Sequence, residues 1–152
     1  ELEGLYPKAA FLDSREVVLF GEKGFVLYQA DSKKIETQEN FESEINSVFC
    51  TNQKLGFIFK NEDDNGKYRM EIYNKAGKKS STYYFDLDYS GMTADDDEVI
   101  LYNDEEMLIY QMGGRVRFRG TFNTAVTGVM PSWEDGLYWL IDDQSLREIR
   151  IR

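Results

Sequence analysis

Short apolar runs alternate with polar connections along the whole chain, and residues 45–88 show this pattern most clearly. The runs are rich in Phe, Tyr, Ile and Val, residue types that suit a pleated, half-buried strand. The connections contain Asn65, Gly66 and Gly77, which can adopt the positive φ angles that tight turns between antiparallel strands need. The pattern therefore predicts a four-stranded antiparallel meander, with strands at residues 45–51, 54–60, 67–74 and 81–88.

A recurring phrase at the end of the third strand shows that this unit is repeated. Tyr28, Tyr73 and Tyr110 are each followed by Gln or Asn, then by a small residue four positions on and a basic residue five positions on. A degenerate fourth copy places the Tyr position at Arg150. The spacings of 45, 37 and 40 residues give a period of about 40 residues, which is the length of one propeller blade.

The second strand of each unit is apolar at nearly every position, as in residues 16–20, 55–59, 98–102 and 137–141. Such runs are typical of strands buried on both faces, as when each blade packs between two others. The first strands carry small residues such as Ala9, Gly91 and Gly128, which suits strands that converge on a narrow axis. Both features favour a β-propeller.

We therefore predict an all-β fold of antiparallel four-stranded blades in a single domain, residues 1–152. Residues 1–6 stand where an outer strand belongs. They would close the last blade of a four-bladed ring, or end a missing blade of a larger ring, and both arrangements stay open. A β-sandwich or barrel that binds a small ligand is a third arrangement. The predicted repeats cover residues 7–44, 45–88, 89–125 and 126–152.

The charge balance of the chain argues against two classes of partner. Lys and Arg number 18 against 28 Asp and Glu, which gives a net charge of -10 and repels nucleic acid and anionic membrane surfaces. No apolar run reaches the roughly 18 residues of a membrane span. Cys50, the only cysteine, lies in an apolar strand, and we expect a buried thiol. Because the chain begins with Glu1, we also expect a processed product or a piece of a longer protein.

The phrase Tyr73-Asn74 followed by Gly77-Lys78 resembles the repeats of WD40-like and quinoprotein-like propellers, although the Trp-Asp dipeptide of true WD40 blades is missing. The chain also resembles the C-terminal part of a family of unknown function from Gram-positive bacteria, whose members carry an N-terminal membrane anchor and an extracytoplasmic propeller. This resemblance implies a bacterial protein outside the cytoplasm with a scaffold role. It supplies no functional residues.

The residue types present exclude several kinds of catalytic site. The chain contains no histidine, which removes Ser-His-Asp and Cys-His systems and His-ligated zinc. One cysteine cannot supply a cysteine zinc site, and no phosphate-binding glycine loop is present. We therefore predict that the protein is not an enzyme and uses no cofactor.

One acidic connection begins like a calcium loop. Asn61, Asp63 and Asn65 fall at its first, third and fifth positions, but Ile72 stands at the twelfth, where a bidentate Glu is needed. Glu71 lies one place early and would face the other side of its strand. We therefore predict a solvated turn and no metal site.

The connections between second and third strands should share one rim of a propeller, and three of the four are strongly acidic. With one exposed aromatic residue they supply the candidate binding residues: Asp63, Asp64, Asp104, Glu105, Asp142, Asp143 and Trp133. We predict a non-catalytic interaction module for a protein or cell-envelope partner, with homodimerisation through open blade edges. The alternative is a carbohydrate-binding or carbohydrate-active propeller that uses two acidic turn residues.

Overall fold

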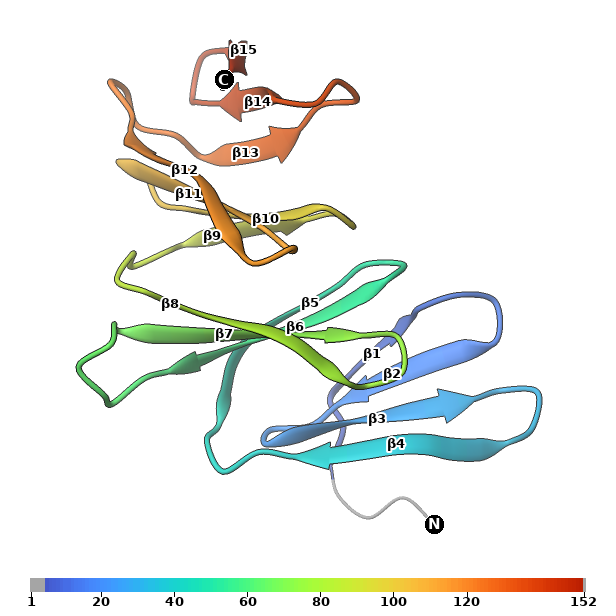
Figure 1. The fold of residues 1–152 in the computed structure, drawn as a ribbon. Helices are drawn as coiled ribbons and strands as arrows, with labels where there is room; N and C mark the ends of the chain where they lie inside the picture. The colour runs from blue at the N-terminus through green and yellow to red at the C-terminus, as the bar shows by residue number, and fades with distance from the viewer. Residues whose placement is uncertain (1–4, 152) are drawn as a thin grey trace. The chain divides into compact units, whose positions relative to one another are not determined.

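The computed structural model describes residues 5–151, and within this range every regular element is a β-strand (Figure 1). The strands are, in chain order, β1 (Lys8–Phe11), β2 (Glu16–Phe20), β3 (Gly24–Gln29), β4 (Lys34–Asn40), β5 (Ile45–Cys50), β6 (Lys54–Lys60), β7 (Tyr68–Asn74), β8 (Lys79–Phe85), β9 (Gly91–Ala94), β10 (Glu98–Tyr102), β11 (Glu106–Gln111), β12 (Arg115–Thr121), β13 (Gly128–Pro131), β14 (Leu137–Ile141) and β15 (Leu146–Arg150). None of the described residues lies in a helix of the length and apolarity that crossing a membrane requires.

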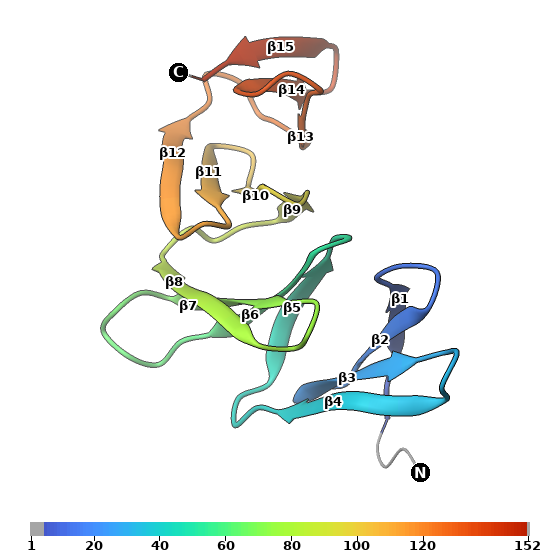
Figure 2. The same ribbon diagram turned by 45° about the vertical axis from the view of Figure 1, so that its right-hand side comes forward.

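The strands form four separate antiparallel sheets, each a meander of consecutive strands (Figure 2). Three sheets have four strands, β1–β4, β5–β8 and β9–β12, and the fourth has three, β13–β15. The chain divides into two compact units, the first from Glu1–Phe85 with two sheets and the second from Asp86–Arg152 with the other two. The predicted all-β fold of four-stranded antiparallel blades is confirmed.

The pairing register explains the recurring Tyr phrase and corrects its fourth copy. In three sheets a β-bulge falls immediately before the Tyr, at Leu27/Tyr28, Ile72/Tyr73 and Ile109/Tyr110. Each Tyr pairs with the second residue of the second strand, as Tyr73 does with Leu55. In the fourth sheet the second residue of the second strand is Tyr138, and it pairs with Ile149. Ile149 therefore occupies the Tyr position, and the prediction of Arg150 was wrong by one residue.

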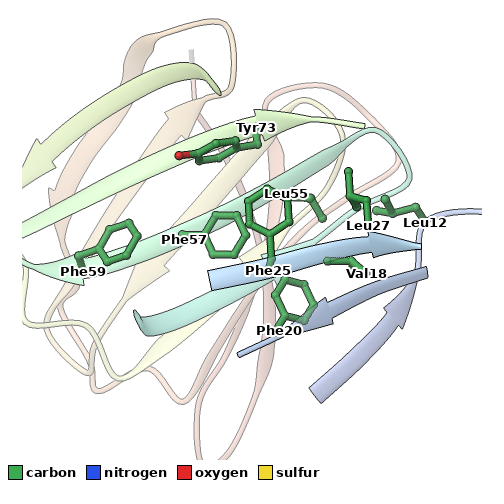
Figure 3. Packing of buried hydrophobic residues seen from close by; sticks show 9 residues of the cluster. All are labelled: Leu12, Val18, Phe20, Phe25, Leu27, Leu55, Phe57, Phe59 and Tyr73. Atoms are coloured by element: carbon green, nitrogen blue, oxygen red, sulfur yellow. The ribbon is translucent and has the colours of Figure 1, made fainter. Parts of the chain in front are cut away.

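The core of the first unit is an aromatic cluster between its two sheets (Figure 3). Phe25 stacks on Phe57 with ring centroids 4.9 Å apart, and Tyr73 meets both rings edge-on at 5.4 Å. Phe41, from the connection after β4, adds edge contacts to Phe57 at 5.1 Å and Phe59 at 5.0 Å. Offset and edge-on geometries of this kind stabilise aromatic pairs beyond the area that they bury.

The second unit buries a mainly aliphatic core between its two sheets. Ile100 and Ile109 come from the sheet β9–β12, and Tyr138 and Leu140 come from the sheet β13–β15. A hydrogen bond of 2.9 Å from the Thr93 hydroxyl to the Val129 carbonyl joins the first strands of the two sheets.

Two expectations need adjustment at particular residues. Cys50 is half-buried, with its thiol 3.6 Å from the Thr51 carbonyl, so the prediction of a buried thiol was too strong. The predicted closing strand at residues 1–6 falls mainly on residues 1–4, which lie outside the described residues. Leu5 and Tyr6 are in no strand.

Candidate functional site

A cleft of about 630 Å³ opens on the first unit, where the turns and connections of its two sheets meet. Its walls come from the β2–β3 turn, the connection from β4 to β5, the start of β5, the end of β6 and the loop that follows, and β7. The residues that line it are Lys23, Glu42, Ser43, Glu44, Ile45, Asn46, Lys60, Asn61, Glu62, Asp63 and Arg69.

Backbone hydrogen bonds fix the connection from β4 to β5 against the β2–β3 turn. The Phe41 amide donates to the Lys23 carbonyl at 2.7 Å, and the Ile45 amide donates to the Glu22 carbonyl at 2.9 Å. The Phe41 side chain enters the aromatic core beneath. This wall of the cleft is therefore anchored at both ends and from below.

The loop between β6 and β7 is held by Asn61. Its side-chain amide donates to the carbonyl of Gly66 at 2.9 Å and to that of Asp63 at 3.2 Å, while its backbone amide donates to the Lys67 carbonyl at 2.8 Å. Gly66 has a φ of 146°, a conformation that side chains disfavour. The sequence therefore folds this loop into one defined shape, with the Asp63 side chain exposed.

Arg69, on β7, is one of the cations that line the cleft. Its guanidinium lies 4.9 Å from the centroid of the Phe59 ring, and its Nε lies 3.2 Å from the Glu71 carboxylate. Stacking and ion pairing together restrict a side chain that would otherwise be mobile. Arg69 thus presents a positioned cation to the cleft.

The lining carries both signs of charge. Three cations, Lys23, Lys60 and Arg69, share the cleft with four carboxylates: Glu42, Glu44, Glu62 and Asp63. Such a surface can form charge-assisted hydrogen bonds with a ligand that itself carries both signs. A polypeptide segment with alternating charges has this chemistry.

The structure places the first two predicted site residues in the same loop. Asp63 lines the cleft, whereas Asp64 is exposed next to it and does not. Neither is confirmed as a binding residue, and both stay predictions.

Asp104 and Glu105 form the exposed tip of the β10–β11 turn in the second unit. Their backbone groups hold this turn, because the Asp104 carbonyl accepts from Val126 at 3.2 Å and the Glu105 carbonyl accepts from Phe122 at 2.7 Å. Binding at these two residues stays a prediction.

Asp142 is committed to its own turn. Its Oδ1 accepts from the amides of Gln144 at 2.9 Å and Ser145 at 2.7 Å, and its Oδ2 pairs with Arg147 at 3.0 Å. These bonds lower the pKa of Asp142, the Gln144 amide most of all. Asp143 beside it is exposed. The structural role of Asp142 was not predicted. Asp side chains in turns commonly accept a hydrogen bond from the backbone amide two residues further on, so the sequence did contain a signal for it.

Trp133, the predicted aromatic site residue, is 86% exposed. It does not stand alone, because the Trp139 ring lies 6.3 Å away at an angle of 52°. Trp139 was not among the predicted site residues.

Three carboxylates are buried, those of Glu16, Glu71 and Glu98, and their burial was not predicted. In the second unit, Glu98 accepts a hydrogen bond of 2.9 Å from the Tyr138 hydroxyl and lies 3.4 Å from Arg117, which in turn pairs with Asp135 at 2.6 Å. Burial raises the pKa of Glu98, against the opposing effects of Tyr138 and Arg117. These residues join two sheets, so we assign them to stability.

The first unit also contains a buried carboxylate with a tyrosine donor, but here the partners lie within one sheet. Glu71 accepts a hydrogen bond of 2.8 Å from the Tyr73 hydroxyl and pairs with Lys79 at 3.5 Å. Burial is the main cause that raises the pKa of Tyr73. Among the described residues, no group of three or more Cys, Asp or Glu side chains is arranged to hold a metal ion.

Comparison with solved structures supports the fold. BBS1N in complex with ARL6DN is similar with a TM-score of 0.63 at 13% identity, over 99% of this chain and 53% of that one. BamB from Moraxella catarrhalis has a TM-score of 0.54 at 13% identity, over 88% of this chain and 39% of that one. Hsv2p from Kluyveromyces lactis has a TM-score of 0.59 at 10% identity, over 95% of this chain and 46% of that one.

These neighbours are β-propeller proteins, and the chain spans about half of their length or less. At such low identity the likeness shows the fold alone. The sequence of the chain matches no curated protein. A family profile, by contrast, matches residues 3–151, nearly the whole chain. The chain therefore belongs to the family of unknown function DUF5711.

Proposed function

We propose that the protein is a non-catalytic interaction module of the propeller type, which binds a segment of a partner protein in the cleft of the first unit. One observation carries this proposal: a cleft of about 630 Å³ lined by three cations and four carboxylates. The β-sheets beneath supply a rigid base, and loops on a rigid base are common binding sites.

The mixed charge of the cleft favours specificity over raw affinity. Exposed charges contribute little binding energy each, but their arrangement selects a complementary partner and speeds its encounter. The positioned Arg69 guanidinium suits a carboxylate of the partner, and the four cleft carboxylates suit its Lys or Arg side chains. The similar propeller BBS1N was solved in complex with another protein, ARL6DN, which agrees with a protein partner for this fold.

Site-specific crosslinking tests the cleft. A photoreactive amino acid in place of Glu62, which is exposed and lines the cleft, should capture one protein from extracts of the cells that express the chain. The same group in place of Asp96, an exposed turn residue of the second unit, is the matched control and should not. Capture should fall in the Lys60→Glu variant and persist in Lys34→Glu, an exposed lysine outside the cleft. Equal capture at both positions, or capture unaffected by Lys60→Glu, would overturn the proposal.

The cellular location and further partners belong to the same proposal. The resemblance to a membrane-anchored Gram-positive family supports an extracytoplasmic location, with an anchor outside residues 1–152, and a cell-envelope partner. Protease treatment of intact cells should then degrade the protein while cytoplasmic markers survive. A second copy of the chain is proposed as a further partner.

A carbohydrate-active function is the second candidate, because four carboxylates line a single cleft. Glycoside hydrolysis uses two carboxyl groups that face each other across the sugar. The test is turnover of oligosaccharides by the wild type, with Glu62→Gln and Asp63→Asn as variants that should abolish it. Binding of protein without any turnover would leave the interaction module as the better account.

A further inference from the structure

Two sheet faces of this chain carry apolar side chains that remain exposed. We name them by one residue each. The Trp139 face belongs to the sheet β13–β15 and lies opposite its core-facing residues Val129, Tyr138 and Leu140. By the alternation of side chains along strands, it consists of Gly128, Met130, Leu137, Trp139, Ile141, Leu146, Glu148 and Arg150.

The Trp139 face is apolar at its centre. Met130 pairs with Trp139 and Ile141 pairs with Leu146 in the sheet, so these four side chains form one patch. Met130 is 43% exposed and Leu146 is 59% exposed. The exposed Trp133 extends the patch through its ring contact with Trp139. Contiguous exposed apolar surface of this kind marks an interaction site.

The Phe11 face belongs to the sheet β1–β4 and lies opposite its core-facing residues Val18, Phe20, Phe25 and Leu27. It consists of Ala9, Phe11, Val17, Leu19, Gly24, Val26, Tyr28, Ile35, Gln38 and Asn40. None of these ten strand residues is charged, on a chain whose charged fraction is 30%. Phe11 is 75% exposed and Ile35 is 40% exposed, whereas Val26 in the same face is buried. A sheet face meant for water would carry polar residues at alternate positions.

The chain itself shows which faces fit together. In the first unit, the third and fifth residues of β2, Val18 and Phe20, pack against the second and fourth residues of β6, Leu55 and Phe57 (Figure 3). The second unit repeats this rule. There the third and fifth residues of β10, Ile100 and Tyr102, pack against the second and fourth residues of β14, Tyr138 and Leu140.

The two exposed faces carry the same two residue patterns that pack against each other inside each unit. Trp139 and Ile141 are the third and fifth residues of β14, and Val17 and Leu19 are the second and fourth residues of β2. A Trp139 face therefore has the pattern that packs on a Phe11 face. The same chain carries both faces. A second copy of the chain therefore offers a Phe11 face to the Trp139 face of the first copy, and a Trp139 face to its Phe11 face.

We propose that two copies of the chain associate head to tail, with the Trp139 face of each copy packed on the Phe11 face of the other. This inference rests on the proposed role as an interaction module, but it uses surfaces other than the cleft. Each copy supplies both faces, so a ring of two copies needs only two contacts to satisfy all four faces, which is the closed form of a head-to-tail association. Two copies together carry eight sheets, which lies within the usual range of propeller blade numbers.

Sedimentation analysis of the purified chain tests this proposal. The wild type should show twice the 17.7 kDa mass of one chain. Phe11→Glu and Met130→Glu each place a charge on one exposed face, and each should raise the dimer dissociation constant at least ~100-fold. Ala30→Glu and Ala125→Glu, exposed alanines in turns of the same two units, are the matched controls and should remain dimeric.

Mixing the two variants separates a head-to-tail dimer from other arrangements. A mixture of Phe11→Glu and Met130→Glu restores one intact pair of faces, so dimers should reappear that neither variant forms alone. Both tryptophans of the chain lie at the Trp139 face, so their emission should shift to shorter wavelength as the wild-type concentration rises. Phe11→Glu should abolish this shift although residue 11 is in the other unit.

Several outcomes would overturn the head-to-tail dimer: a monomeric wild type, open-ended oligomers, an ineffective Phe11→Glu, or no recovery in the mixture. The far-ultraviolet circular dichroism of each variant confirms that it is folded. Lys60→Glu, which tests the cleft, should leave the dimer intact, so failure of the cleft proposal and failure of the dimer are distinguishable.

Discussion

The hydroxyl of Tyr138 donates a hydrogen bond of 2.9 Å to the carboxylate of Glu98, and the two side chains come from the two different sheets of the second unit. Both residues are buried. The bond therefore acts as a polar connection inside an otherwise apolar contact between sheets, and it leads to two predictions.

The first prediction concerns the loss of this bond. Tyr138→Phe leaves a buried carboxylate without one of its donors, and we expect the free energy of unfolding to fall by roughly 1–3 kcal/mol. Urea denaturation measures this change. Tyr102→Phe is the control, because the Tyr102 hydroxyl has no hydrogen-bond partner among the bonds found in residues 5–151, and it should have little effect.

The second prediction concerns pH. Burial raises the pKa of Glu98 above its ordinary value of 4.5, so the folded protein holds this proton more tightly than the unfolded chain does. The stability that protonated Glu98 contributes is fully present below pH 4.5 and is lost as the pH rises through the folded-state pKa. Glu98→Gln cannot ionise. The free energy of unfolding of the wild type minus that of Glu98→Gln should therefore decrease with rising pH over this window and then level off. A difference that increases with pH would contradict the assignment.

The third prediction concerns the turn held by Asp142. Asp142→Ala removes the acceptor for the amides of Gln144 and Ser145, and we expect a lower Tm at pH 7. Because these bonds lower the pKa of Asp142 below 3.8, its contribution is present above that pH and should vanish as the pH falls through the folded-state pKa. Calorimetry across pH checks both parts. Asp143→Ala, the exposed neighbour, is the control and should leave the Tm at pH 7 unchanged.

The fourth prediction concerns close packing in the sheet β5–β8. A Cβ atom at Gly56 would lie 1.9 Å from the Phe49 ring, so the ring must move to accept it. We expect Gly56→Ala to destabilise the protein by roughly 1–3 kcal/mol. Gly113→Ala is the matched control, because a Cβ there meets nothing within 4 Å. In the double variant Gly56→Ala/Phe49→Leu the cost should shrink, and strictly additive costs would show that the ring is not the cause.

The strands could be predicted because their local signals agree with their final surroundings. The run predicted at residues 54–60 is β6, Lys54–Lys60, and the run predicted at 67–74 differs from β7 by one residue. The bounds of these strands follow from local features, namely their apolar residues and the turns that flank them, and these local features agree with the final fold. The degenerate fourth repeat was misplaced at Arg150 because it lacks a Tyr, and only the pairing of Tyr138 with Ile149 fixes its register.

The cleft could not be predicted, because its walls come from separate parts of the sequence. Lys23, Glu44 and Arg69 lie on three different segments, and no spacing rule relates them. Runs of Asp and Glu favoured the prediction of binding at acidic turns. The cations that share the cleft stand singly in the sequence, and only the fold brings them beside Asp63.

Glu98 and Glu71 were missed for a related reason. A single Glu in a strand is usually solvated, and the pattern of apolar residues does not show that a tyrosine hydroxyl will donate to it. Tyr138 reaches Glu98 from 40 positions away in the chain. Burial of a charge depends on tertiary partners, which periodicity does not report.

The meander order of every sheet has a consequence for how the chain acquires its structure. All strand neighbours within a sheet are also neighbours in sequence, so each ladder can form as soon as the next hairpin has been synthesised. Short loops are closed at a small entropic cost, and contacts of this kind favour fast folding. We expect the first unit to complete both of its sheets while the second is still emerging from the ribosome, so that unpaired strands are short-lived during synthesis.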